Sequence, residues 1–188
     1  MNLAPLTIRG AVIERVKLSK LLGVTLSVDL TWNEHIVTAI KKCNQRLFLL
    51  LHLRRAGVPP KDLVTLYKAT IRPVLEYAAP VWHSELPNCL SKDLEQVQRR
   101  ALRTCFGDGP YNELLNTAGL PTLYDCRERL CRLFYAKMNK PEHRVHHLLP
   151  TPRACRYTLR HPRRLPELKA RKRRYGNSFV PWAVRVFD

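Results

Sequence analysis

The sequence is poor in acidic residues relative to basic ones. Its 188 residues include 15 Asp and Glu but 33 Lys and Arg, which gives a formal net charge of +18. The second half is the more basic, with 20 basic and 8 acidic side chains from residue 95 onward. Such a surplus favours a polyanionic partner, with nucleic acid ahead of an anionic membrane surface. The alternative is a basic protein whose charge has no specific partner.

The sequence also lacks long apolar runs and a secretion signal. Its longest apolar run, residues 47–51, is far below the roughly 20 residues that span a bilayer. The N-terminus has neither a basic nor an apolar leader region, so we expect a nuclear or cytoplasmic protein that is not secreted. No basic region has the pattern of a membrane-surface helix, so no membrane partner is expected. The six cysteines have no disulfide-framework spacing, which favours reduced thiols.

One group of thiols and imidazoles approaches the spacing of a zinc site. It consists of Cys126, Cys131, His143 and His147. The two cysteines are five residues apart in an expected helix, so their side chains point about 140° apart around its axis. One tetrahedral ion cannot bind both without unwinding the helix. Buried thiols are therefore expected, with no metal or other cofactor.

Short strands are expected only near the N-terminus. Residues 6–16 have the pattern of two strands joined by a turn at Arg9 and Gly10, and residues 20–26 form another strand candidate. So few strands need another element to cover them. The sequence predicts a small β element within residues 1–30.

Helical patterns dominate the rest of the chain. Thr31 and Glu34 have capping-box spacing and predict a helix that runs to Ala56, with Gly57 as its end. Its inward stripe is Ile36, Ile40, Cys43, Leu47 and Leu50. Residues 47–51 are apolar all around the helix, so we expect more than one neighbour to bury that end.

The central stretch combines a continuous apolar stripe with an internal proline. From residue 63 onward, apolar side chains recur at helical spacing through residue 78. Pro73 interrupts this pattern, and keeping a helix through it costs roughly 3 kcal/mol. We expect a kinked helix, starting near Pro60, that is held at the centre of a packed bundle.

Further helices follow in order. Ser91 is expected to cap a helix with an inner face of Leu94, Val97, Ala101, Leu102 and Cys105. A short helix should span residues 110–118 and end at Gly119. Thr122 and Asp125 should cap a helix to about Asn139, with Leu123, Cys126, Leu130, Leu133 and Phe134 facing inward. Residues 141–188 form a basic, proline-containing arm, whose last residues, 179–187, are apolar enough to dock back as a short helix. The expected fold is mainly α: a helical bundle with a small N-terminal β hairpin and an extended basic C-terminal arm.

Several of these stretches together resemble one family, the proteins of LINE-type non-LTR retrotransposons, in the segment after the catalytic core of their reverse transcriptase. The matching segments are residues 20–26, 30–36, 66–82, 94–103, 120–129 and 175–182, among them Ile-Arg-Pro-Val-Leu-Glu-Tyr at 71–77. Each motif alone has little specificity, but six in the same order cover nearly the whole chain.

The resemblance implies a thumb-like helical region of an RNA-directed DNA polymerase. In that family catalysis depends on carboxylates of an upstream palm, whereas this sequence contains no Asp-Asp pair. The implied organisation is a β element in residues 1–30 at the edge of a palm, a thumb-like bundle in 31–140 and a basic arm in 141–188. The chain is expected to be non-catalytic alone, with the palm of the same polyprotein as a partner if present.

Three groups of cations are the candidate nucleic-acid contacts. In the central helix, Lys61, Lys68 and Arg72 are expected opposite the apolar stripe. In the next helix, Arg99, Arg100 and Arg103 share the outer face. In the arm, Arg171, Lys172, Arg173 and Arg174 precede Tyr175, whose ring could stack on a base. For each single residue, a solvated polar face is about as good an explanation.

The predicted function is contact with template and primer, as RNA or an RNA–DNA hybrid, through these basic faces. The cluster at 171–174 is equally compatible with nuclear entry. His35 and His83 each lie near a glutamate, but neither has a nucleophile at a recognisable spacing, so a helix-start side chain and a loop histidine are expected. The three tryptophans are expected to anchor packing, with stacking on nucleic acid as the alternative for Trp182. The competing hypothesis is a host-adopted helical protein-interaction module with no nucleic-acid role.

Overall fold

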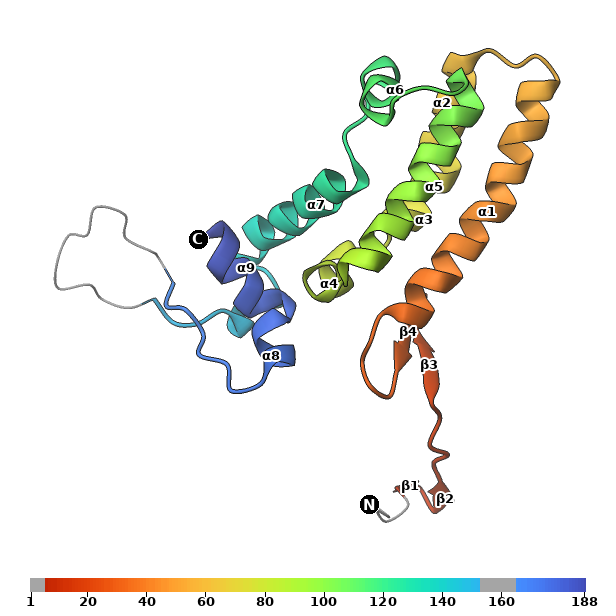
Figure 1. The fold of residues 1–188 in the computed structure, drawn as a ribbon. Helices are drawn as coiled ribbons and strands as arrows, with labels where there is room; N and C mark the ends of the chain where they lie inside the picture. The colour runs from red at the N-terminus through yellow and green to blue at the C-terminus, as the bar shows by residue number, and fades with distance from the viewer. Residues whose placement is uncertain (1–5, 153–164) are drawn as a thin grey trace, which may run out of the picture.

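The computed structural model describes residues 6–152 and 165–188, and the chain folds mainly into helices (Figure 1). The longest are α1 (Asn33–Arg55) and α5 (Asn88–Phe106), which lie side by side. The central stretch packs against both as α2 (Pro60–Leu66), a π-helical turn η1 (Tyr67–Ile71) and α3 (Arg72–Glu76). The predicted mainly α class is confirmed.

The core lies between these helices. It contains fully buried side chains from each of them, among them Ile36, Leu50, Leu63, Tyr67, Ile71, Leu75, Leu94, Val97, Ala101 and Leu102. All five residues predicted for the inner face of α5 are buried. Because helical periodicity determines which side chains share a face, this part of the core follows from the sequence.

The central helix passes Pro73 through the π-helical turn. Within η1 the Arg72 amide bonds to the Tyr67 carbonyl, five residues back, in place of the α-helical partner four residues back. The turn ends where α3 begins at Arg72, and Pro73, which has no amide hydrogen, is the second residue of α3. Two α1 side chains bond to the carbonyls of the turn: Cys43 donates to Ile71 over 3.8 Å, and Arg46 donates to Thr70. A π-turn is one of the known causes of a helix irregularity at such a site.

The stretch ends earlier than its apolar pattern predicts. After Glu76, Tyr77 is extended (ψ 128°) and Ala78 adopts φ +54°. Tyr77 is 51% exposed, so its place in the inward stripe was wrong. Its hydroxyl instead donates to the Leu22 carbonyl over 2.6 Å, which ties the N-terminal hairpin to the helix.

Of the three features predicted for α1, one is confirmed and two are wrong. The capping box is wrong, because the Thr31 hydroxyl donates to Asp29 and α1 begins at Asn33 with no side-chain cap. The C-terminus is confirmed, since α1 ends at Arg55 and Gly57 has φ +84°. Near that end, Phe48 and Leu49 are 65% and 53% exposed, so the expected burial on all sides is also wrong.

The N-terminal strands form two separate antiparallel pairs. Strands β1 (Thr7–Ile8) and β2 (Ala11–Val12) meet at the predicted Arg9–Gly10 turn, and this hairpin projects away from the bundle (Figure 1). The single strand predicted over 20–26 is in fact a hairpin of β3 (Leu18–Leu21) and β4 (Val24–Ser27). The turn between them has Gly23 at φ +85°. β4 packs on α1, where the Thr25 amide donates to His35 Nδ1 over 3.4 Å.

The later helices keep most of their predicted bounds. α5 begins three residues before its predicted Ser91 cap, after Pro87. α6 (Tyr111–Ala118) ends at Gly119, and α7 (Leu123–Met138) is capped by Thr122, which accepts from the Asp125 amide. Leu133 is 53% exposed, so its predicted inward position is wrong.

The C-terminal end packs back onto the helices. Short helices α4 (Ala79–Trp82) and α8 (Arg173–Asn177) flank the start of α9 (Phe179–Phe187), which packs against α7. A second, small apolar cluster forms there from Tyr135, Leu165, Ala183 and Val184, as the predicted docking of residues 179–187 requires. The 3-10 turns η2 (His83–Glu85) and η3 (His146–Leu148) complete the described elements.

Candidate nucleic-acid interface

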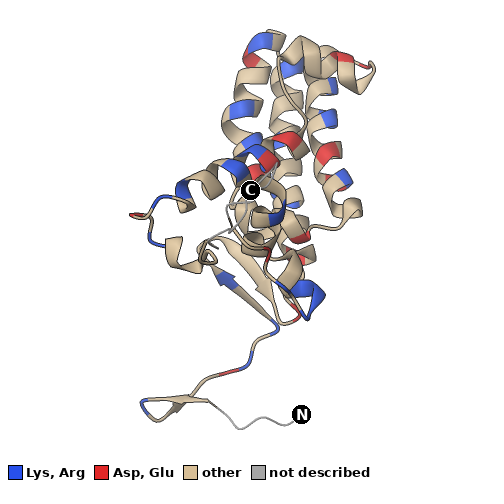
Figure 2. Cartoon of the chain, turned by 90° about the vertical axis from the view of Figure 1, so that its left-hand side faces the viewer, with Lys and Arg blue, Asp and Glu red and all other residues tan. Residues whose placement is uncertain are grey.

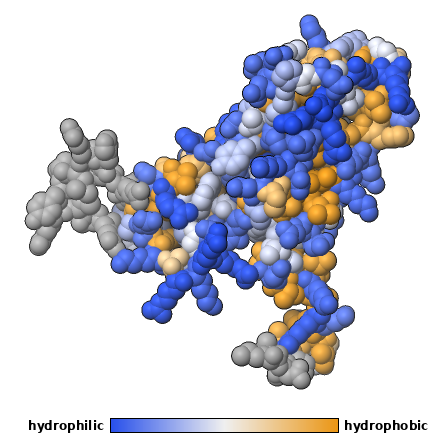
Figure 3. Space-filling view, in the orientation of Figure 1, coloured by the Kyte–Doolittle hydropathy of each residue, from blue (hydrophilic) through white to orange (hydrophobic). Residues whose placement is uncertain are grey.

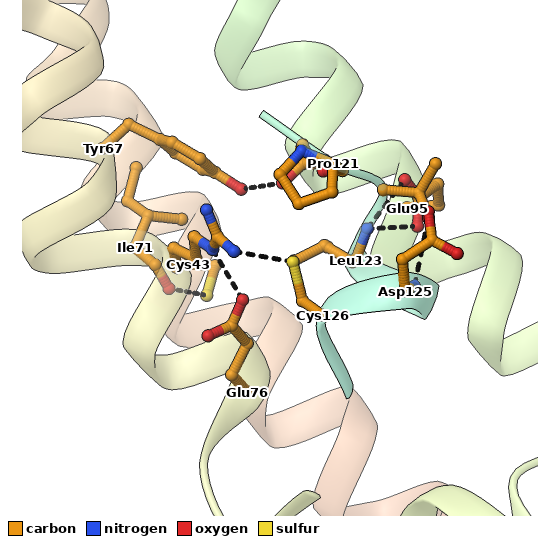
Figure 4. Close-up of polar contacts among 12 residues, drawn as sticks. Cys43, Tyr67, Ile71, Glu76, Glu95, Pro121, Leu123, Asp125 and Cys126 are labelled. Atoms are coloured by element: carbon orange, nitrogen blue, oxygen red, sulfur yellow. Dashed lines mark hydrogen bonds and ion pairs between the residues drawn. The ribbon is translucent and has the colours of Figure 1, made fainter. Parts of the chain in front are cut away.

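The central helix exposes two of its three candidate cations. Lys61 and Lys68 are exposed. Arg72 is not on the outer row where its position was predicted: its side chain is 14% exposed and forms an ion pair with Glu76 over 2.6 Å. Its Nη2 also donates to Cys126 Sγ over 2.6 Å, so Arg72 joins the central helix to α7. Figure 4 labels the two partners of this arginine, Glu76 and Cys126. This geometry gives Arg72 a packing role.

The three candidate arginines of α5 have different surroundings. Arg99 is half-buried, with its guanidinium carbon 4.9 Å from the centre of the Tyr111 ring. Arg100 is exposed and donates to Asn44 of α1 over 2.9 Å. Arg103 is exposed and lies 3.7 Å from a carboxylate oxygen of Asp108. Arg100 therefore lies where α1 and α5 adjoin.

A cation that the sequence did not single out lies at the same junction. Arg54, near the end of α1, donates to the carbonyls of Arg103 and Thr104 over 2.8 and 2.5 Å. These carbonyls lie in the last turn of α5, where unpaired oxygens make the helix end negative. The interaction fixes the end of α1 against α5 and keeps a positive charge beside Arg103.

The basic cluster of the arm lies at the other end of the bundle. Arg171, Lys172, Arg173 and Arg174 are exposed, and the Tyr175 ring is 52% exposed. Arg174 donates to the Asp29 carbonyl over 2.5 Å, which places the cluster beside the loop before α1. The ten predicted residues therefore do not form one continuous site. They occupy the central helix, the outer face of α5 and the start of α8.

A buried polar network supports the α5 group. The Tyr67 hydroxyl donates to Gln98 Oε1 over 2.6 Å, and Gln98 Nε2 donates to the Tyr111 hydroxyl and the Pro121 carbonyl, each over 3.0 Å. The Tyr111 hydroxyl in turn donates to Glu95. Burial raises the pKa of both tyrosines well above the usual range, so they remain neutral donors. The network holds the Tyr111 ring under Arg99.

A second polar group is buried around Arg127. This arginine is fully buried, and its Nη2 donates to Ser91 over 2.7 Å. Its guanidinium carbon lies 5.7 Å from the Trp82 ring centre, a cation–π distance. Burial lowers its pKa, since the charged form loses its hydration. His83 is also buried, so the predicted loop histidine is wrong; burial, and then the charge of Arg127, lowers its pKa to about 4.

The cysteines of the candidate zinc site are buried thiols, as predicted. Cys126 and Cys131 are 1% and 0% exposed, and burial raises their pKa to about 11 and about 12. Cys43 and Cys105 are buried as well, whereas Cys89 is exposed. Cys155 lies outside the described residues. No group of three or more His, Cys, Asp or Glu in residues 6–152 and 165–188 has a metal-binding arrangement.

Basic side chains are spread over the helices, while apolar side chains reach the surface in patches. Figure 2 shows Lys and Arg along most helices, with fewer acidic positions between them. In Figure 3 the surface is mostly hydrophilic, with apolar areas over the upper part of α1 and on the β1–β2 hairpin. Exposed large apolar side chains include Phe48 and Leu49 in the second half of α1, and Leu6, Ile8 and Val12 in and next to the β1–β2 hairpin. In the described part of the chain, no helix has the length and apolar character needed to cross a bilayer.

Comparison with known proteins gives one curated relative and one short family match. The chain is 26% identical over 110 residues to a probable RNA-directed DNA polymerase from transposon BS of Drosophila melanogaster. That alignment covers 57% of this chain but 12% of the relative, so the chain spans about an eighth of the relative's length. It supports a distant relationship to a reverse transcriptase.

The family match concerns a different group of proteins. A family model described as the N-terminal region of alkylated DNA repair protein alkB homolog 8 matches residues 32–72, which is less than a quarter of the chain. These residues comprise α1, α2 and the π-helical turn. No solved structure matches the chain.

Proposed function

We propose that this chain is a non-catalytic, nucleic-acid-binding segment of a reverse transcriptase of the retrotransposon type. In this proposal it corresponds to the region after the palm, with residues 31–140 as a thumb-like bundle and 141–188 as a basic arm. Its proposed ligand is a template–primer of RNA or an RNA–DNA hybrid. The distant relationship to the Drosophila polymerase and the charge of +18 support this assignment.

The observation that carries the proposal is the set of basic side chains left available at the surface. In residues 6–152 and 165–188, no ion pair reaches the exposed Lys61, Lys68 and Arg100. The half-buried Arg99 also has no ion pair there. The same is true of the exposed cluster at 171–174. Because phosphate contacts require cations that are not already neutralised, these positions suit the backbone of a nucleic acid. Arg72 is excluded from the proposed contact surface by its pair with Glu76.

The experiment is a salt titration of binding. We expect the chain to bind an RNA–DNA hybrid at low salt, with log K falling linearly against log salt concentration. The variant Arg171→Gln/Lys172→Gln/Arg173→Gln removes three charges but leaves Arg174 and its bond to Asp29. If all three cations contact phosphates, the slope should become shallower by about 2 to 3. Absence of binding at low salt would refute the proposal.

A matched control separates specific contacts from net charge. Lys137, Lys140 and Arg144 are also exposed and basic but lie after the middle of α7, outside the proposed surfaces. The variant Lys137→Gln/Lys140→Gln/Arg144→Gln has the same net charge as the first variant. Equal slopes for the two variants would mean that binding depends on overall charge and that the cluster at 171–174 has no particular role.

The competing function, a protein-interaction module, is favoured by one feature of the surface. A largely apolar pocket of about 500 Å³ lies among α4, α7 and α9, with Val81, Phe134 and Phe179 in its lining. Val81 is 50% exposed. If the chain is a protein-interaction module, its binding of nucleic acid should be weak and should not depend on which basic residues are substituted. Substitution of the proposed phosphate-contact residues should then leave binding of the protein partner unchanged.

A further inference from the structure

A groove outside all the predicted sites has a strongly basic lining. It lies between the β3–β4 hairpin, the first half of α1 and α3, with a volume of about 450 Å³. Its lining includes Lys20 from β3 and Lys42 and Arg46 from α1. No carboxylate from the described part of the chain lines it. The groove therefore has three cations and no acidic side chain.

Two of the three cations, Lys42 and Arg46, form a row on the α1 wall. Lys42 and Arg46 are four residues apart and so lie one above the other on α1, about 6 Å apart along its axis. Thr38 is one turn further back and adds a hydroxyl to the same row. Both Lys42 and Lys20 are exposed, and no ion pair to either is present in the described residues.

Arg46 is held in place by the unusual geometry of the central helix. Its Nη1 donates to the Thr70 carbonyl in the π-helical turn. A guanidinium has five N–H donors, so this bond leaves others for a phosphate. The π-turn thus orients an arginine at the groove, and Pro73, just after the turn, contributes to the opposite wall.

The opposite wall also presents an aromatic ring. Tyr77 lines the groove and is 51% exposed, while its hydroxyl is fixed on the Leu22 carbonyl. The hairpin approaches this ring closely, because a Cβ at residue 23 would lie 3.2 Å from Tyr77 Cε1. Gly23, at φ +85°, permits that approach. The ring is therefore held at a fixed position beside the groove while half of the residue stays exposed.

We propose that this groove binds one nucleotide of an unpaired nucleic-acid strand. The strand's phosphates on either side of that nucleotide contact Lys20, Lys42 and Arg46, and its base lies against Tyr77. The combination of a basic track and an aromatic platform is the common arrangement for single strands. The volume is in the range of pockets that enclose one small molecule, which suits a single nucleotide better than a duplex. This inference rests on the proposed nucleic-acid function and adds a site separate from the three groups of candidate cations.

The first test compares two double variants of the whole chain. Lys20→Gln/Lys42→Gln removes two cations that line the groove. The control, Lys17→Gln/Lys41→Gln, removes two exposed cations that lie nearby in the sequence but do not line the groove. Binding of a labelled single-stranded oligonucleotide is measured by anisotropy as salt is varied. We expect the salt slope of the groove variant to become shallower by about 1.4, and that of the control to change much less.

A second measurement locates the base directly. An oligonucleotide that contains 5-bromouridine is cross-linked to the wild-type chain by ultraviolet light, and the modified peptide is identified by mass spectrometry. The expected site is Tyr77, and Tyr77→Leu should remove that cross-link. Competition with a mononucleotide tests whether the groove instead holds a free nucleotide; equal affinity for the two would overturn the assignment to a strand.

The outcomes separate this inference from the proposed function. If the wild-type chain binds no nucleic acid at low salt, the proposed function and the groove assignment both fail. If it binds but the two double variants have equal slopes, or the cross-links map away from Tyr77, the groove assignment alone fails. Thermal unfolding followed by circular dichroism confirms that all variants are folded before binding is compared.

Discussion

Several polar side chains are buried in the bundle, and their surroundings determine their protonation. Arg127 and His83 are the main pair, since both are buried. Arg127 lies against the Trp82 ring, and the His83 ring contacts Tyr124 and Trp182. Arg127 Nε and Nη1 and His83 Nδ1 have no hydrogen-bond partner among the described residues. An unpaired buried charge is costly, so protonation of His83 next to Arg127 is strongly disfavoured.

This burial predicts a loss of stability in mild acid. The pKa of His83 is about 4 in the folded chain and about 6.5 in the unfolded chain, so between these values the unfolded state binds more protons. The free energy of unfolding must therefore fall as the pH falls through that window, by about 2 kcal/mol between pH 7 and pH 5. His35, whose pKa is also lowered by burial, contributes in the same direction. Urea unfolding at the two pH values measures the effect.

A pair of histidine variants assigns the effect to its source. His83→Gln should remove most of the pH dependence, while His147→Gln, at an exposed position, should leave it unchanged. If both variants keep the wild-type dependence, protonation of His83 is not the cause.

For single residues, the sequence predicts positions that depend on helical spacing but not contacts between distant segments of the chain. Gln98 is four residues from both Leu94 and Leu102, so its position on the inner face of α5 was available from periodicity. The ion pair of Arg72 and Glu76 likewise has the four-residue spacing of helical pairs. Arg127, in contrast, is buried where it donates a hydrogen bond to Ser91 and lies against the Trp82 ring. Both residues are distant in sequence, and nothing near Arg127 in the chain indicates these contacts.

Elements were predictable where their boundaries depend on nearby residues. Gly57 and Gly119, both with positive φ, end α1 and α6 as expected, and Thr122 caps α7. The helix starts that were predicted wrongly are those at which the expected capping side chain has another hydrogen-bond partner. Thr31 could cap α1 but instead bonds to Asp29, and Ser91 could cap α5 but accepts from Arg127. Such competition is decided by the folded loop and the neighbouring helix.

The π-helical turn is the element that most directly connects packing with the proposed groove. Replacement of Pro73 by alanine supplies an amide hydrogen and removes the ring that α-helices avoid. We expect Pro73→Ala to straighten the central helix with little change in helix content by circular dichroism. Affinity for nucleic acid should change more, because residue 73 lines the groove and the turn positions Arg46.

Amide exchange and binding measured on the same variant decide between two roles of Pro73. A straight helix with altered affinity supports a role in binding. A straight helix with wild-type affinity would show that the irregularity serves packing alone.

On the scale of the whole molecule, the described part of the chain has two apolar cores of very different size. The larger lies among α1, the central helix and α5, and the smaller holds α9 against α7. The C-terminal Asp188 closes the smaller core, since its side chain accepts from the Leu165 amide over 2.7 Å. Because so few side chains form the second core, α9 should detach without unfolding the bundle.

Hydrogen exchange on a matched pair of variants tests this independence. Val184→Asp places a charge at a position that is 1% exposed, at a cost of roughly 3 kcal/mol or more, so α9 should lose its amide protection while α1 and α5 keep theirs. Val186→Asp makes the same change on the same helix at a position that is 47% exposed, and should have little effect. Simultaneous loss of protection in α5 would show that the two cores unfold as one unit.

The π-helical turn of residues 67–71 also has a consequence for the comparison of related chains. A hydrogen bond that spans five residues accommodates one more residue than a regular α-helix of the same height. A related chain whose central helix is regular should therefore be one residue shorter between its equivalents of Leu63 and Leu75, both of which are buried here. An alignment without a gap in this interval would assign every later core position to the wrong face of the helix. The turn is in effect a one-residue insertion that the fold has retained. A one-residue gap at this place in an alignment should therefore mark the relatives whose central helix has no such turn.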